Sequence, residues 1–381
     1  MINFQLSKQQ EQMRQLARQF AQQQIRPVAA QYDANEESPR PVIEQAAQQG
    51  LMTYRYPEQY AGAGIESVLT ACVVTEELGW GCAGIGNSLL AGDTGALPIL
   101  LGGSQAQKDR YIPGFADVKH IKIGAFALTE PEAGSDVTAI RATAVREGDH
   151  YILNGEKWLI TGAGVADVYI VFAKLEPAGI TAFIVEADSP GLTAAKTPGK
   201  MGMRASPIGT VTLDDVRVPV INRLGDEGQG FYLAMRFFEY NRPVLASLAV
   251  GLARAAYEYA ADYAQKRVQF GAPIMNNQAI SFMLADMATQ IDAARLLVWR
   301  AAWMVDQGTS ANAQASMAKL HATDVAMQTT TDAVQILGGI GIMQDCPVEK
   351  WMRDAKILQM VEGTSQIQRM IISQLLAVNK A

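Results

Sequence analysis

A lone carboxylate near the C-terminus, Glu362, lies between the apolar pair Met360-Val361 and a Gly-Thr-Ser turn. An ordinary glutamate has a pKa of about 4.3 and is a weak base. Burial among apolar groups would raise that pKa toward the range in which the carboxylate can take a proton from carbon. The alternative is a helix start, with Thr364 as the N-cap and the acid stabilised by the helix dipole. Taken alone, the stretch favours this alternative.

A second candidate is the loop within "ALTEPEAGSDV" (127–137), where Thr129 ends an apolar stretch and Gly134 and Ser135 follow. Such a loop can direct backbone N–H groups and hydroxyls at a phosphate or at the polar edge of a ring. An ordinary Gly-Ser-Asp turn is the alternative, and local composition favours it. The common dinucleotide and P-loop signatures are missing from the sequence, and "GGIGIM" (338–343) follows no predicted strand.

The segment "QKRVQFGAPIMNNQAISFMLADM" (265–287) contains further ligand-binding residue types. Arg267 could pair with a phosphate through two hydrogen bonds, Phe270 could pack on a ring, and Gln278 could hydrogen-bond one. The alternative is a helix–loop–helix with a surface arginine.

Two charges, Glu239 and Arg242, lie inside the apolar segment "FFEYNRPVLA" (237–246). Buried charges need partners. They could pair with each other at i,i+3 on a helix or face a ligand, and this segment does not decide between the two.

Composition excludes several function classes. A chain of 381 residues with a net charge of −6 suggests two or three domains and no nucleic-acid surface. No apolar run approaches the ~20 residues of a membrane helix, and the start has neither a signal nor a transit pattern. Three Cys without CxxC spacing and three distant His predict reduced thiols in a cytoplasm and no metal site.

The elements that must position these residues fall into three parts, predicted as 1–120, 121–227 and 228–381. The first part is helical by periodicity, with helices at roughly 40–50, 66–80 and 104–117. An earlier helix with the stripe Met13, Leu16 and Phe20 is expected to end near Arg26-Pro27, because proline restricts the residue before it.

The middle part contains short segments rich in β-branched and aromatic residues, and Asn154-Gly155 is a strong hairpin signal. Strands without intervening helices predict an antiparallel sheet or barrel rather than a Rossmann unit. The last part is predicted to be a helical bundle with faces left for subunit contacts. Its helices are expected at 228–266, 277–306, 310–337 and 364–378.

Together the motifs resemble the acyl-CoA dehydrogenase family over essentially the whole chain. They occur in one order: "TEPEAGSD", "NGEKWLITG", "RVQFGAPI", "QAISFMLADM", "DAVQILGGIG", "PVEKWMRDAK" and "VEGTSQIQR". The resemblance implies a mostly α fold with an N-terminal helical domain, a middle antiparallel β-barrel or sandwich and a C-terminal four-helix bundle. It also implies a homotetrameric, FAD-dependent enzyme of fatty-acid β-oxidation that converts an acyl-CoA to the trans-2-enoyl-CoA and passes electrons to an electron-transferring flavoprotein.

The resemblance also implies roles for individual residues. Glu362 would take the α-proton, since Asn241 stands where some members carry the base. Its backbone N–H and a flavin ribityl hydroxyl would hold the thioester oxygen. The implied FAD contacts, some from a neighbouring subunit, are Phe126, Leu128, Thr129, Gly134, Ser135, Leu159, Ile160, Thr161, Arg267, Gln269, Phe270, Gln278, Gln335, Gly338, Gly339, Thr364 and Gln366. The implied acyl-CoA contacts are Ser135, Glu239, Arg242 and Gly363.

One departure from the family pattern concerns the flavin wall, where many members carry Trp and this chain carries Leu159. Because strand side chains alternate, Trp158 is expected to point away from the ring. The regions implied for the acyl end, Leu90–Thr94 and Met235–Glu239, are largely apolar and favour a short or medium acyl chain. An acyl-CoA oxidase, an enoyl-CoA reductase and a non-catalytic flavin- or CoA-binding scaffold are the alternative functions.

Overall fold

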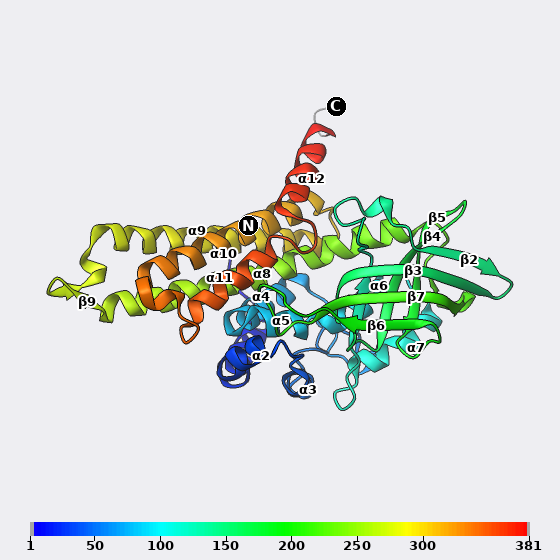
Figure 1. Ribbon diagram of the computed structural model, residues 1–381, viewed down its shortest axis with the longest axis horizontal. Helices are drawn as coiled ribbons and strands as arrows, with labels where there is room; N and C mark the ends of the chain where they lie inside the picture. The colour runs from blue at the N-terminus through cyan, green and yellow to red at the C-terminus, as the bar shows by residue number, and fades with distance from the viewer. Residues whose placement is uncertain (1–3, 379–381) are drawn as a thin grey trace.

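The computed structural model describes residues 4–378 and shows a helical bundle at one end of the long axis and a β-sheet at the other (Figure 1). The N-terminal helices lie beneath the junction of the two. They are α1 (Lys8–Phe20), α2 (Ala29–Asn35), α3 (Arg40–Gln48), α4 (Val68–Gly81), α5 (Ala83–Leu89), α6 (Ala91–Gly102) and α7 (Gln105–Ala116). Among the described residues, no helix combines the length and apolar character that crossing a membrane requires.

The expected helix end near Arg26-Pro27 is wrong, because the chain stays helical through it. After α1 a π-helical turn covers Ala21–Ile25, a 3₁₀ turn covers Arg26–Val28, and α2 follows. Pro27 lies in the first turn of the 3₁₀ helix, where its missing N–H breaks no hydrogen bond. The sequence analysis also did not predict α5 and α6.

The middle part forms one eight-stranded sheet in the order β6-β7-β3-β2-β4-β5-β8, with β1 paired to β4. All its pairings are antiparallel except β1–β4 and β2–β4. The strands are β1 (Gly124–Ala127), β2 (Thr143–Glu147), β3 (His150–Thr161), β4 (Val168–Leu175), β5 (Gly179–Glu186), β6 (Leu192–Lys196), β7 (Ile208–Pro219) and β8 (Arg223–Leu224).

The hairpin predicted at Asn154-Gly155 is wrong, since β3 runs unbroken through that pair. The register against β7 shifts there, and the Asn154 side chain exchanges two hydrogen bonds with Asp215, at 2.9 and 2.8 Å. The two residues therefore form a bulge, the other common use of Gly in a strand. The turn into β3 is instead Gly148-Asp149, between the paired residues Glu147 and His150.

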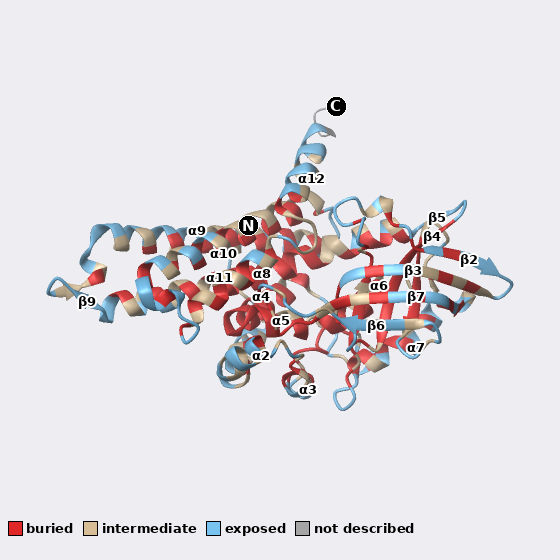
Figure 2. Cartoon of the chain, viewed as in Figure 1, coloured by how far each residue is buried: buried red, intermediate tan, exposed pale blue. Residues whose placement is uncertain are grey.

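The C-terminal part is α-helical apart from a two-stranded hairpin. Its helices are α8 (Gly230–Lys266), α9 (Gln278–Asp306), α10 (Asn312–Leu337), α11 (Pro347–Leu358) and α12 (Ser365–Val378), and β9 (Val268–Gln269) pairs with β10 (Ala272–Pro273). The sequence analysis did not predict α11. Figure 2 shows α12 projecting from the body with a largely exposed surface.

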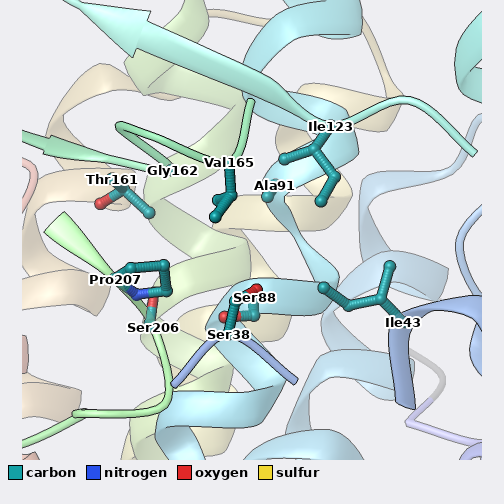
Figure 3. Close-up of a pocket in the computed structure, with 10 residues that line it drawn as sticks. All are labelled: Ser38, Ile43, Ser88, Ala91, Ile123, Thr161, Gly162, Val165, Ser206 and Pro207. Atoms are coloured by element: carbon teal, nitrogen blue, oxygen red, sulfur yellow. The ribbon is translucent and has the colours of Figure 1, made fainter. Parts of the chain in front are cut away.

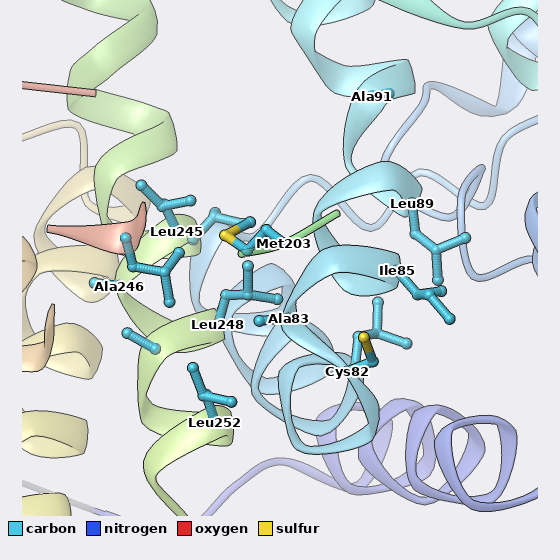
Figure 4. Close-up of a cluster of buried hydrophobic side chains, with 14 of the residues drawn as sticks. Cys82, Ala83, Ile85, Leu89, Ala91, Met203, Leu245, Ala246, Leu248 and Leu252 are labelled. Atoms are coloured by element: carbon cyan, nitrogen blue, oxygen red, sulfur yellow. The ribbon is translucent and has the colours of Figure 1, made fainter. Parts of the chain in front are cut away.

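Close helix packing joins the N-terminal part to the bundle. A Cβ at Gly79 of α4 would lie 2.4 Å from the carbonyl oxygen of Leu248, and one at Gly251 of α8 would lie 2.0 Å from that of Glu76. The two backbones therefore touch, which only glycine permits. Cys82, Leu89, Met203, Leu245 and Leu252 are among the buried side chains that gather around this junction (Figure 4). The core is thus continuous beneath the turn that carries Glu362.

Candidate active site

Glu362 lies on the turn between α11 and α12, in the left-handed region at φ 54°, and Gly363 follows at φ 94°. A non-glycine residue rarely adopts this conformation, and it concentrates at functional sites. The turn directs the carboxylate at α8, where the Asn241 side-chain amide donates to Oε1. The other oxygen, Oε2, is buried and has no hydrogen-bond partner among the described residues.

Burial raises the pKa of Glu362 to about 7. The hydrogen bond from Asn241 and the positive charges of Arg242 and Lys319 oppose that rise. Met360, which was expected to help bury the acid, is itself 49% exposed in this chain. The apolar environment comes from the packed helices, and it brings the pKa into the range of an effective general base at neutral pH.

Side chains from three helices hold the backbone of this turn. The Glu362 carbonyl accepts from Arg242 Nε at 3.4 Å and from Gln368 Nε2 at 3.0 Å. The Gly363 carbonyl accepts from Gln368 Nε2 at 3.0 Å and from Lys319 Nζ at 2.8 Å. At the start of α12, the Thr364 hydroxyl accepts from the Ile367 N–H at 3.3 Å. The capping interpretation of the motif is therefore correct for Thr364, while Glu362 points elsewhere.

Arg242 and Glu239 form no ion pair with each other. Glu239 Oε1 accepts from the Ala311 N–H at 2.6 Å, at the start of α10, while Arg242 turns toward Glu362. The structure thus brings Arg242 and Gly363 to Glu362, whereas the Glu239 carboxylate caps a neighbouring helix.

A buried ion pair fixes the 128–142 loop against the sheet. Lys157 of β3 donates to Glu130 at 2.6 Å and to the Leu128 carbonyl at 3.2 Å. Glu130 also accepts the backbone N–H groups of Arg141 at 2.5 Å and Ala142 at 3.0 Å. The loop that contains Thr129, exposed Gly134 and exposed Ser135 is therefore held at both ends.

Immediately after Lys157, β3 bulges and breaks the expected alternation of side chains. The side chains of Trp158 and Leu159 are both exposed, at 39% and 43%, while Lys157 and Ile160 on either side are buried. Between its pairings with Val211 and Gly209, β3 has two residues where β7 has one, and Leu159 is left-handed at φ 55°. Strict alternation does not survive a bulge, so the expectation that Trp158 points away from the flavin ring loses its basis and stays a prediction.

Several predicted FAD contacts lie inside the protein. Leu128 and Ile160 are buried in the core, so only their backbones could contact a ligand. Phe126 stacks on Phe237 with ring centroids 4.4 Å apart. Thr161 ends β3 at a small cavity of about 10 Å³, where Figure 3 shows it beside Val165 and Gly162.

Of the remaining predicted contacts, those in the β9–β10 hairpin and at the start of α9 lie far from the loop and the bulge. Arg267, Gln269 and Phe270 belong to the β9–β10 hairpin and Gln278 begins α9, at the end of the bundle opposite the sheet (Figure 1). Phe270 is completely exposed, at 104%, with φ 51°. At the end of α10, Gln335, Gly338 and Gly339 are exposed, as is Gln366 in the first turn of α12. One chain therefore does not assemble all the predicted FAD contacts.

A cavity of about 370 Å³ lies between segment 55–60, α6 and α8. The buried ion pair of Arg55 and Asp93, 2.5 Å apart, forms part of its wall, as does Tyr240. Leu90 and Met235, expected at the acyl end, do not border this cavity.

Two residues beside Glu362 were missed from the sequence. Asn241 was considered only as a replaced base, although its amide donates to Glu362. Lys319 was not considered at all. The sequence feature that could have identified Lys319 is its position: it is a single charge on the helix face formed by the small residues Ala315, Ala322 and Ala326, which are buried in α10.

Models of one family match all three parts of the chain. They are described as the acyl-CoA dehydrogenase N-terminal, middle and C-terminal domains and match residues 7–119, 125–216 and 228–377. An acyl-CoA dehydrogenase of Bacillus subtilis (strain 168) is 45% identical, over 96% of this chain and 97% of that protein.

Two solved structures have nearly the same fold. The butyryl-CoA dehydrogenase from Megasphaera elsdenii has a TM-score of 0.95 and 40% identity, over 99% of this chain and 100% of that one. A chain in a structure described as the electron transferring flavoprotein of Acidaminococcus fermentans also has a TM-score of 0.95 and 40% identity, over 98% of this chain and 99% of that chain.

Proposed function

The chain belongs to the acyl-CoA dehydrogenase family, and we propose that it dehydrogenates an acyl-CoA between the α and β carbons with Glu362 as the base. Members of this family are FAD-dependent oxidoreductases that act on CH–CH groups. The product of the proposed reaction is the trans-2-enoyl-CoA.

The observation that carries the proposal is the difference between the two oxygens of the buried Glu362 carboxylate. Asn241 fixes Oε1, whereas Oε2 is buried, has no partner among the described residues and is free to receive the α-proton. A pKa of about 7 matches a base that must be ionised before substrate binds and must hold a proton afterwards.

The backbone of the same turn is suited to hold the thioester oxygen. The carbonyls of Glu362 and Gly363 are engaged by Arg242, Lys319 and Gln368, which holds the two peptides that follow the Glu362 N–H. No described residue accepts a hydrogen bond from the Glu362 N–H. This N–H is therefore available to stabilise negative charge as it develops on the thioester oxygen.

The chain's own surface fits a flavin beside the sheet. Exposed Trp158 and Leu159 offer an apolar face, and the Thr129, Ser135 and Thr161 hydroxyls lie in the adjoining segments. A Cβ at Gly134 would meet nothing within 4 Å, so the loop leaves room for a ligand. Bound FAD supplies the acceptor for the hydride that leaves the β carbon.

A second copy of the chain would supply the rest of the FAD site. Arg267 forms no ion pair with any described residue, and Phe270 projects into solvent. Large exposed apolar side chains also occur at Ile342 and Met370. Such surfaces mark interfaces, which supports a homo-oligomer, a tetramer by family resemblance, with Arg267, Gln269 and Phe270 reaching the cofactor of a neighbour.

A short acyl chain and an electron-transferring flavoprotein complete the proposal. The similarity to a butyryl-CoA dehydrogenase supports the first, and the chain of similar fold in an electron transferring flavoprotein structure supports the second. Three buried, unpaired cysteines are consistent with a reducing cytoplasm.

The test is anaerobic mixing of the flavin-loaded protein with acyl-CoA thioesters of increasing length. We expect rapid bleaching of the flavin, fastest with short chains. A flavin that no acyl-CoA bleaches would overturn the proposed reaction. Turnover in air that equals turnover with the protein carrier would identify an oxidase instead.

A further inference from the structure

Lys319 of α10 is a fully buried cation without a contact anion. Its ammonium donates to two backbone carbonyls, those of Gly363 at 2.8 Å and Gln359 at 3.3 Å. No carboxylate among residues 4–378 forms a salt bridge with it, whereas the buried Lys157 and Lys350 each have one. A buried charge without a contact partner destabilises the folded protein. A purely structural role therefore explains poorly why this residue is a lysine.

The charged groups that face Lys319 come from three elements: Glu362 on the turn, Arg242 on α8 and Asp324 on α10 itself. Asp324 is already engaged, because it accepts from Gln359 Nε2 at 2.7 Å, from Ser365 Oγ at 3.1 Å and from Arg369 at 3.1 Å. Glu362 has no salt bridge among the described residues and only the neutral amide of Asn241 as a donor to its carboxylate. The base and the lysine therefore remain as complementary charges in one buried region.

We propose that Lys319 is a positioning residue for Glu362. Its ammonium holds the Gln359–Gly363 turn through two backbone carbonyls and supplies the positive charge that keeps Glu362 ionised. The inference rests on the proposed role of Glu362. Lys319 touches neither the reacting atoms nor the carboxylate. It acts through its hydrogen bonds to the turn and through the electrostatic field of its charge.

The titration of the two groups agrees with this geometry. Burial lowers the pKa of Lys319 to about 8, and the charge of Glu362 opposes that fall. Conversely, Lys319 lowers the pKa of Glu362 against the effect of burial. Loss of the lysine charge should therefore raise the pKa of the base and remove ionised enzyme at low pH.

The first experiment is the pH profile of flavin reduction in Lys319→Met, which removes donor and charge, and Lys319→Gln, which keeps a donor. Both should shift the acid limb upward by about 0.5–1 pH unit, so that activity falls about 3–10-fold at pH 6 but less than about 2-fold at pH 8. Thr323→Val is the matched control, since its hydroxyl bonds only to α10 carbonyls. If the variants lose activity by the same factor at every pH, Lys319 has only a structural role and the proposal is overturned.

The second experiment needs no activity. Melting temperatures of the wild-type protein, Glu362→Gln, Lys319→Gln and the double variant are measured from pH 5 to 9. The stability difference between the wild type and Glu362→Gln should grow with pH and level off at the pKa of Glu362 in the folded chain, and this levelling-off pH should rise in the Lys319→Gln background. An unchanged levelling-off pH would overturn the coupling. If no acyl-CoA bleaches the flavin while the coupling is present, the proposed function fails and Lys319 still tunes Glu362.

Discussion

The Glu362 turn and the β9–β10 hairpin both carry residues that the sequence motifs single out, but the folded chain treats them in opposite ways. The turn is enclosed by α8, α10 and α12, and its carbonyls have donors from all three. The hairpin lies at the far end of the bundle, with Phe270 fully exposed and Arg267 exposed. One chain completes the geometry around Glu362, whereas the exposed hairpin would acquire its neighbours from another molecule in the proposed assembly.

The loop that contains Thr129 lies between these extremes. Its base is fixed by the buried pair of Lys157 and Glu130, while Gly134 and Ser135 are exposed. The three regions therefore differ in how far contacts within the same chain hold them in place. Substitutions should separate them by what each loses: chemistry at the turn, folding at the pair, and assembly at the hairpin.

The largest expected effect is on catalysis at the turn. Glu362→Gln keeps the shape and the acceptor for Asn241 but removes the base, so flavin reduction by acyl-CoA should slow by about 10²–10⁴-fold. Anaerobic stopped-flow absorbance measures this rate, and the flavin spectrum of the variant should be unchanged. Rapid bleaching in Glu362→Gln would exclude this residue as the base.

The next effect is on the folding of the loop. Lys157→Met leaves the buried Glu130 carboxylate without its cation, which should destabilise the protein by about 3–5 kcal/mol. Lys266→Met is the matched control, because its pair with Asp262 is exposed and should contribute under about 1 kcal/mol. Denaturant unfolding of both variants provides the comparison. Equal losses would mean that the buried pair does not fix the loop.

A smaller effect should appear in the pH dependence of stability. The pKa of Glu362 lies near 7 in the folded chain and near 4.5 when unfolded, so this group favours the folded state at low pH and loses that contribution as pH rises from 4.5 to 7. Glu362→Gln has no such loss. Its stability relative to the wild type should increase over this interval, by at most about 3.4 kcal/mol at 1.36 kcal/mol per pH unit, and stay constant above pH 7.

The contrast between turn and hairpin also explains what the sequence could predict. Periodicity located the long helices and most strands, because each buries one face in a regular pattern. The hairpin predicted at Asn154 and the side-chain alternation assumed at Leu159 both failed because each residue lies in a bulge. Bulges depend on the register against β7, which no local pattern encodes. Pro27 was misjudged because a helix can change its hydrogen-bonding pattern and continue.

For the site, the motifs named the proposed base but not the residues around it. Glu362 and Thr364 are two residues apart in the sequence, so one motif contains both. Asn241 and Lys319 come from helices 121 and 43 residues earlier, and only tertiary packing brings them to the turn. A lone lysine in the small-residue register of α10 was the one available signal.

The smallest effect on folding should come from the hairpin. Phe270 contacts no core residue in this chain, so Phe270→Ala should change the free energy of unfolding of the separated chain by no more than about 0.5 kcal/mol. If the hairpin reaches a neighbour, the same substitution should lower FAD retention and shift the assembly toward smaller species, measured by flavin content and light scattering. Tyr232→Ala is the matched control, because that ring is also exposed but lies at the start of α8 near the sheet. Since neither ring stabilises its own chain, any loss confined to Phe270→Ala must arise from contacts with another molecule; equal behaviour of the two variants would show that the hairpin is an ordinary surface turn.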